Sequence, residues 1–511
     1  MGDKAAVLSS KVSFVIQAQN EEKTIGKVIS QIKKLKPHEI IVVVNGSTDQ
    51  TSKIVQSSKC TLLEYENPLG INLGKAIGAF HASGDILVFL DADIVIPSDR
   101  LLSFVQAIQG GSDVALNDLN WAMKRKVRPH PTSLSKKALN LFLGREELGI
   151  NALGAIPNAF SRKAVEQIGW WNLVDPPLAQ TMGILDDLSF SAPISVDVIR
   201  TNKIRPEQHR TKAANSPYPK STSRVIGDHL QAIKYLTEQK GIRGGYADDR
   251  KRPSETASCK DMRIKRSAVI SLEQGSKQLK NTIKVLRNIN VKEIVVVGSM
   301  DSQLLSDLKE ARIIAVPMQE SLGSYASRML GTLNSSGKVT LFVDGHSALT
   351  EKDLLPFYEA VEKGTDIALN NTSFLLDTIH PIDPQSTIQY FLNIAIKKPG
   401  LLNSSLVTTP YAIHRQVIKK IDVQSWMIPP LAYVEVVLHG FKISAPRTVK
   451  VSSLPLNRSN CRNIFLGDHI EAIHHYLQKT NERGGFTDGG KNRALLEEMK
   501  KGSSLNEKGE I

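Results

Sequence analysis

Residues 84–94 read GDILVFLDADI and form the most informative stretch of the chain. Five consecutive apolar residues precede two carboxylates, Asp91 and Asp93. An unbroken apolar run of this kind is typical of a strand buried on both faces of a parallel sheet. Because ligands of open α/β sheets bind outside the carboxyl ends of the strands, we expect both carboxylates to lie beside a ligand.

The two carboxylates suit a divalent cation. Carboxylate oxygens are ligands that Mg²⁺ and Mn²⁺ prefer, and both ions keep open coordination positions for phosphate oxygens. An isolated Asp-x-Asp is more often a simple turn, so the interpretation depends on the neighbouring segments.

Those segments alternate between strands and helices. Residues 12–18 and 39–44 are predicted strands, residues 21–34 are a predicted helix with one apolar face, and a further helix begins near Thr51. This alternation predicts an α/β fold with a mostly parallel, doubly wound sheet. In the later, less regular half, the expected elements are a helix at residues 176–188 and a strand at residues 194–199.

The sequence contains an internal duplication. Residues 227–249, GDHLQAIKYLTEQKGIRGGYADD, return as GDHIEAIHHYLQKTNERGGFTDG at residues 467–489, and residues 84–94 return as GKVTLFVDGHS at residues 337–347. The matches keep their order, and each copy is too long for a solenoid repeat, so we expect two tandem domains of one fold. The expected division is a first domain at residues 1–250, a polar linker at residues 251–262 and a second domain at residues 263–511.

Composition limits the classes of partner. With 511 residues, 41% hydrophobic and 23% charged, the chain has a globular composition. Cys60, Cys259 and Cys461 lie far apart, which favours neither a zinc site nor a disulfide framework. The net charge of +14 favours an acidic partner, but no basic stretch is interleaved with aromatic residues, so nucleic acid is not the expected one. Without a signal peptide or transmembrane segment, the expected location is the cytoplasm, including the membrane periphery.

Three motifs carry a family resemblance: VIQAQNEEKTIG at residues 15–26, VVNGSTDQT at residues 43–51, and the long segment at residues 67–94. Together they resemble the family 2 glycosyltransferases of the GT-A fold, over the whole first copy and over the second in outline. The resemblance implies two tandem GT-A-like domains (nucleotide-diphospho-sugar transferases) and a UDP- or GDP-sugar donor. It also implies Mn²⁺ or Mg²⁺ and inverting transfer of a hexose to a small molecule or cell-envelope precursor.

The resemblance also suggests which residues contact the nucleotide. Gln17, Asn20 and Glu22 match positions that line the base and ribose. Asn45 stands where the family commonly has an aspartate that binds uracil, which leaves the base open because an amide both donates and accepts. Asp49 matches a nucleotide contact. Helix capping explains Asn20, Glu22 and Asp49 equally well, and both interpretations stay open.

Further residues are expected at the diphosphate and the metal. Lys75, in LGKAIG, would place a cation near the donor phosphates, with a solvated surface lysine as the alternative. Asp93 would bind the metal directly, and Asp91 would bind ribose or a metal-bound water. His209, in IRPEQHR, matches a histidine that some GT-A enzymes bring to the metal or diphosphate, although a lone histidine is often incidental.

An inverting transfer needs a carboxylate to accept the acceptor's proton. The family's acidic position at the start of a late helix falls on Asp175, in VDPP, where the two prolines depart from the family pattern. Asp187, with Asp186 before it, is the second candidate for this base. A solvated helix end is the alternative explanation for that pair.

The second copy lacks most of these groups, so we expect it to be non-catalytic. Asp91 persists as Asp344. The remaining positions change: Lys75 to Arg328, Asp93 to His346, Asp175 to Ile428 and His209 to Arg462. The second copy could dimerise with the first copy, bind acceptor or regulate, and the chain could form a homo-oligomer. Features kept in both copies, such as Gly227-Asp228-His229 and Arg243-Gly244-Gly245, are expected to be structural.

Two other functions stay open. One is a synthase of a glycosylated small phosphorylated acid. The other is a regulatory protein that binds nucleotide sugars without catalysis. The intact Asp91, Asp93 and Lys75 argue against the regulatory protein.

Overall fold

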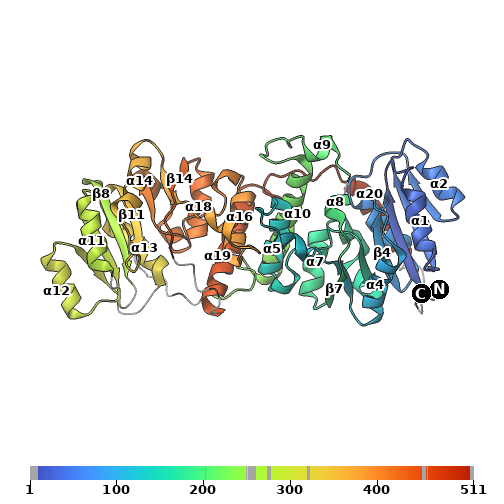
Figure 1. Ribbon diagram of the computed structural model, residues 1–511, viewed down its shortest axis with the longest axis horizontal. Helices are drawn as coiled ribbons and strands as arrows, with labels where there is room; N and C mark the ends of the chain where they lie inside the picture. Colours follow the sequence, from blue (N-terminus) through green and yellow to red (C-terminus); the bar gives the residue numbers. More distant parts are fainter. Residues whose placement is uncertain are drawn as a thin grey trace. The chain divides into compact units, whose positions relative to one another are not determined.

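The computed structural model describes residues 10–201, 203–248, 250, 260–272, 278–318, 323–451, 456 and 459–506. The chain divides into two compact units (Figure 1). The first unit comprises residues 1–125, 130–236 and 485–511, and the second comprises residues 126–129 and 237–484. Among the described residues, no helix is both long and apolar enough to cross a bilayer.

The first unit is built on a seven-stranded sheet with the order β3-β2-β1-β4-β6-β5-β7. Its strands pair in parallel except β6, which runs antiparallel to both β4 and β5. This confirms the predicted α/β class. The strands are β1 (Val12–Ala18), β2 (Glu39–Asn45), β3 (Thr61–Tyr65), β4 (Ile86–Asp91), β5 (Val114–Asn117), β6 (Asn158–Ser161) and β7 (Phe190–Ile194).

Helices cover both faces of this sheet because its central strands are apolar on both sides. The helices α1 (Ile25–Lys33) and α4 (Ser98–Gln109) pack on one face, and α3 (Leu73–His81), α6 (Arg162–Ile168) and α7 (Pro176–Leu185) pack on the other. The approach of α3 is close, since a Cβ atom on Gly78 would lie 2.2 Å from Val15 Cγ1. Only glycine permits this contact without a shift of the helix.

The expected strand at residues 194–199 is wrong. Strand β7 ends at Ile194, and a short helix, α8 (Val198–Thr201), follows. The side chain of Asn117 explains the difference: its Oδ1 accepts from Val196 N at 2.8 Å, and its Nδ2 donates to Val196 O at 2.9 Å. These bonds replace the strand pairing and lead the chain off the sheet edge.

The second unit repeats the architecture, as a duplication predicts. Its seven-stranded sheet has the order β10-β9-β8-β11-β13-β12-β14, with one strand, β13, antiparallel to its neighbours. Its strands are β8 (Ile264–Leu272), β9 (Glu293–Gly298), β10 (Ile314–Pro317), β11 (Gly337–Asp344), β12 (Ile367–Asn370), β13 (Tyr411–His414) and β14 (Ile443–Arg447).

The C-terminal segments of the two copies are exchanged between the two units. Residues 485–511 belong to the first unit, which contains helix α20 (Arg493–Asn506) (Figure 1). Leu496 of α20 joins the hydrophobic core of this unit. In the second unit, Arg243 donates to Asp468 of α19 (Ser459–Lys479) at 2.8 Å. Residues 251–259 of the expected linker lie outside the described residues.

Candidate functional site

Asp91 ends strand β4 at the carboxyl edge of the first sheet, as expected. It lies in register with Gln17 of β1, whose Nε2 donates to Asp91 Oδ1. Burial raises the pKa of Asp91, and the nearby charge of Lys75 opposes that rise. The structure therefore brings Gln17, Lys75 and Asp91 together.

Lys75 lines a small pocket at this edge. Only 5% of the residue is exposed, and burial lowers the pKa of its ammonium. Within the described part of the chain, Lys75 Nζ forms no hydrogen bond or close ion pair, so its charge is available to a ligand. The solvated-lysine alternative is thereby excluded. The pocket is lined by Lys75, Phe89, Leu153, Asn158, Phe160, Leu173, Pro176 and Ala179.

Asp93 is paired with an arginine that sequence reasoning missed. Arg205 Nη2 lies 3.2 Å from Asp93 Oδ2 and 3.0 Å from Glu21 Oε1, and Lys203 Nζ lies 3.4 Å from the same Glu21 oxygen. Glu21 is 6% exposed. Its position just after the first strand could have indicated a site residue, but Glu21 was not among the residues predicted from the sequence.

His209 lies beside Arg205 on the short helix α9 (Pro206–His209). Its Nδ1 accepts a hydrogen bond from the backbone N–H of Arg205 at 2.8 Å. A neutral ring that accepts at Nδ1 carries its proton at Nε2, so neither nitrogen offers a free lone pair to a metal. In this arrangement His209 can donate to a phosphate oxygen.

Asn20, Glu22 and Asp49 hold two loops together. Asn20 Oδ1 accepts from Thr48 N at 2.8 Å, Asp49 Oδ2 from Glu22 N at 3.1 Å, and Glu22 Oε2 from Gln50 N at 3.1 Å. Each of these hydrogen bonds joins a side chain of one loop to a backbone N–H of the facing loop. They favour the capping and loop-bracing interpretation over direct nucleotide contact.

Asn45, at the end of β2, binds the loop that leads into α3. Its Oδ1 accepts from Leu69 N, and its Nδ2 donates to Gly70 O at 3.1 Å. Both ends of the amide are therefore engaged with backbone. This accounts for an asparagine at the position where the resembled family has an aspartate.

Asp175, the expected base, lies in a buried ion-pair cluster. It is 2% exposed, Lys491 Nζ contacts its Oδ1, and Arg493 Nη1 lies 2.9 Å from its Oδ2. Burial opposes ionisation, but the charges of Lys491 and Arg493 prevail and lower the pKa of Asp175. A carboxylate with both oxygens paired and a lowered pKa is poorly suited to accept a proton from an acceptor.

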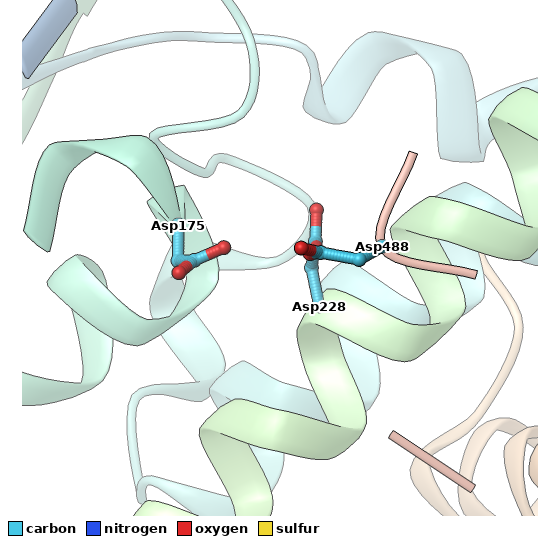
Figure 2. Close-up of side chains that lie close together, drawn as sticks. All are labelled: Asp175, Asp228 and Asp488. Atoms are coloured by element: carbon cyan, nitrogen blue, oxygen red, sulfur yellow. The ribbon is translucent and has the colours of Figure 1, made fainter. Parts of the chain in front are cut away.

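The same cluster resembles a metal site. Oxygen atoms of Asp175, Asp228 and Asp488 lie within 4.8 Å of one another, and Figure 2 shows these carboxylates converging from α7, α10 (Lys220–Lys240) and the C-terminal segment. The Lys491 ammonium contacts Asp175 and lies 2.9 Å from Asp228 and 3.6 Å from Asp488. This cation already balances the carboxylates, so Asp91 and Asp93 are the better metal candidates.

Asp187 lies at the far end of α7. Its φ is +58°, its N–H donates to Ile184 O at 3.2 Å, and its side chain is exposed. A helix of this length rises about 14 Å, which separates Asp187 from the pocket-lining Pro176. The solvated helix end is therefore the better explanation of Asp187 and of Asp186 beside it.

The second unit fills the space that corresponds to the Lys75 pocket. Arg328 Nη2 donates to Asp344 at 3.3 Å, and its Nη1 donates to Val407 O at 3.2 Å. The rings of Tyr325 and Tyr411 flank the guanidinium at 5.3 and 5.7 Å. At this place the second unit therefore has an internally paired arginine where the first unit has Lys75.

Comparisons with known proteins match part of the chain. Residues 13–168 match the model of the family "Glycosyl transferase family 2". A dolichol-phosphate mannosyltransferase of Pyrococcus furiosus is 31% identical over 132 residues, which cover 23% of this chain and 38% of the relative. A bactoprenol glucosyl transferase of Shigella phage SfV is 31% identical over 147 residues, which cover 26% of this chain and 44% of the relative. The chain thus spans less than half the length of these relatives.

The comparison with solved structures gives a partial match at low identity. Glucosyl-3-phosphoglycerate synthase from Mycobacterium tuberculosis, crystallised with Mn²⁺, UDP and glucosyl-3-phosphoglycerate, is 21% identical. The match covers 47% of this chain and 82% of that chain, with a TM-score of 0.32.

Proposed function

We propose that the chain, whose residues 13–168 form a family 2 glycosyltransferase domain, transfers a hexose from a UDP- or GDP-sugar to an acceptor. The observation that carries the proposal is the joint placement of Asp91, Asp93 and Lys75 at the carboxyl edge of the first sheet. In the second unit, an internal Arg328–Asp344 pair and an exposed His346 replace this set.

Asp91 and Asp93 fit a divalent cation because they supply hard oxygen ligands at one strand end. They would hold Mn²⁺ or Mg²⁺, which when bound neutralises the charge that develops on the leaving diphosphate. Lys75 would hold the diphosphate by its buried charge. His209 Nε2–H and the Arg205 guanidinium provide further donors for phosphate oxygens.

Lysines near the pocket favour an anionic acceptor. Lys136 of α5 (Pro131–Phe142) is half-buried, and burial together with the charge of Lys75 lowers its pKa to about 8. A bound anion would relieve the repulsion between these two lysines. At the matching place on α16 (Pro384–Ala395) the second unit has Gln389, which binds Ser405 and Thr408.

The positions of the two candidate bases favour the same kind of acceptor. Because neither Asp175 nor Asp187 is placed to accept a proton, an ionised phosphate oxygen is a suitable nucleophile, since it needs no deprotonation. The named relatives act in dolichol-phosphate and bactoprenol glycosylation. A polyprenyl phosphate at the cytoplasmic face of a membrane is therefore our first candidate acceptor, and the net charge of +14 would favour approach to an anionic surface.

A small phosphorylated acid is the second candidate, supported by the Lys75–Lys136 pair. Inversion at the anomeric carbon remains part of the proposal through the family resemblance. The anomer of the product distinguishes inversion from retention.

A thermal-shift screen of UDP- and GDP-sugars with and without Mn²⁺ tests the donor site. We expect a stabilising hit that is lost in Asp93→Ala and kept in His346→Ala. Nucleotide release is then measured with a polyprenyl phosphate or with 3-phosphoglycerate as acceptor. Binding without turnover on any acceptor would favour the regulatory alternative, and absence of nucleotide binding would overturn the proposal.

A further inference from the structure

The C-terminal segment of the second copy reaches the donor side of the first unit's pocket. Asn492 donates its backbone N–H to Leu69 O at 2.9 Å. Gly70, with φ of +84°, packs so closely that a Cβ atom there would lie 2.6 Å from Gly490 O. The loop at residues 69–72 leads directly into α3, which carries Lys75.

The same segment also holds the opposite wall. Lys491, whose side chain has no exposed surface, contacts Asp175 and Asp228, and Arg493 pairs with both oxygens of Asp175. Asp175 is the residue that precedes α7. Helix α7 contributes Pro176 and Ala179 to the pocket in which Lys75 lies.

We propose that residues 488–493, the C-terminal strap, position the two walls of the first unit's pocket. This inference rests on the proposed transferase function. The strap contacts the loop before Lys75 and the residue before α7, so it fixes the spacing between the donor-side lysine and the acceptor-side helix. Lys491 and Arg493 are positioning residues: they act on α7 through their contacts with Asp175.

The exchange of C-terminal segments explains why a copy without its own chemistry would be retained. The strap's counterpart in the first copy belongs to the second unit, where Arg250 Nη1 and Nη2 bind Asp468 at 2.9 and 2.7 Å. Asp468 corresponds in the repeat to Asp228, which Lys491 binds. The active unit therefore depends on a segment that the second copy supplies.

The test compares Lys491→Met, Lys491→Arg and Arg250→Met in the full chain. Loss of the buried cation removes the shared contact of Asp175 and Asp228, leaves Arg493 as the remaining strap contact of Asp175, and loosens the hold on α7. A misplaced catalytic group costs about 100-fold in rate, so we expect kcat of Lys491→Met to fall by about that factor, with a smaller change in KM for the nucleotide sugar. Lys491→Arg should restore most of the activity. Arg250→Met removes a comparable buried pair from the second unit and should lower the melting temperature without changing kcat.

Gly70→Ala gives a second measurement that spares the ion pairs. The new methyl group would displace the strap from the donor loop, and we expect the same loss of kcat. Calorimetric titration with UDP and Mn²⁺ separates the two proposals, because a wild-type chain that binds UDP without turnover defeats only the transferase function. In that case weaker UDP binding by Gly70→Ala and Lys491→Met would still support the strap. Wild-type kinetics and UDP affinity in folded Lys491→Met, or equal loss in Lys491→Met and Arg250→Met, would overturn it.

Discussion

Arg205 donates a hydrogen bond to the Asp93 carboxylate across 3.2 Å, at the sheet edge where a metal ion is proposed to bind. The guanidinium therefore balances the charge of Asp93 in this structure. A divalent cation must compete with Arg205 for the same oxygen atoms. The affinity for the metal therefore depends on whether the loop that carries Arg205 keeps the guanidinium on Asp93.

Arg205→Gln should tighten Mn²⁺ binding when no nucleotide is present. The Arg205 side chain is 38% exposed, so its pair with Asp93 is worth at most about 1 kcal/mol, which corresponds to roughly a fivefold gain in affinity. Nucleotide affinity should fall, because a phosphate donor is lost. Calorimetric titration measures both. Arg447→Gln, which breaks the Asp353 pair of the second unit, is the control. Weaker Mn²⁺ binding in Arg205→Gln would contradict the competition.

Lys75→Arg should abolish most turnover although the charge is kept. In the second unit, an arginine at this place donates to Asp344 and to Val407 O and fills the available space. An arginine in the first unit would turn toward Asp91 in the same way and occupy the pocket. Loss of one well-placed donor costs about 100-fold in kcat. Nucleotide release under saturating donor measures the effect, with Arg328→Lys as the matched variant. Near-normal kcat in Lys75→Arg would show that charge alone matters.

Local sequence patterns were sufficient to predict the first strands of the fold. The apolar runs predicted β1 and β2 to within one residue, because strands buried on both faces leave a continuous signal. The strand expected at residues 194–199 failed because the Asn117 side chain, distant in sequence, takes the backbone bonds of Val196. The pattern of apolar residues within a segment does not reveal a hydrogen bond to a side chain elsewhere in the chain.

The site was predictable only where a motif is local. Asp91, Asp93 and Lys75 lie where their motifs place them. The ion pairs of Asp175 were not predictable, because Lys491 and Arg493 come from the far end of the chain. Since the repeat makes Asp228 and Asp468 equivalent, the sequence does not tell which C-terminal segment meets which aspartate.

The close contact of α3 with β1 predicts a matched pair of stability changes. A Cβ atom on Gly78 would lie 2.2 Å from Val15 Cγ1, and one on Gly331 would lie 2.2 Å from Val269 Cγ1 in the second unit. Overpacking of this kind costs about 1–3 kcal/mol. We therefore expect Gly78→Ala and Gly331→Ala each to lower the urea midpoint of the full chain. Gly154→Ala, where a Cβ atom meets nothing within 4 Å, is the control. Midpoints unchanged from wild type would show that the helices can shift at little cost.

The buried histidines His229 and His469 predict that stability falls in mild acid. Each Nδ1 donates to a backbone carbonyl at 2.7 Å, and burial lowers the pKa of each ring from 6.5 to about 4. The unfolded chain takes up these protons first, so the stabilisation is complete above pH 6.5 and is lost as the pH falls toward 4. Between pH 7 and pH 5 each ring should cost roughly 2 kcal/mol of unfolding free energy. Urea unfolding at both pH values measures the loss. His229→Gln and His469→Gln should each remove part of this pH dependence, and an unchanged slope in both variants would assign it to other groups.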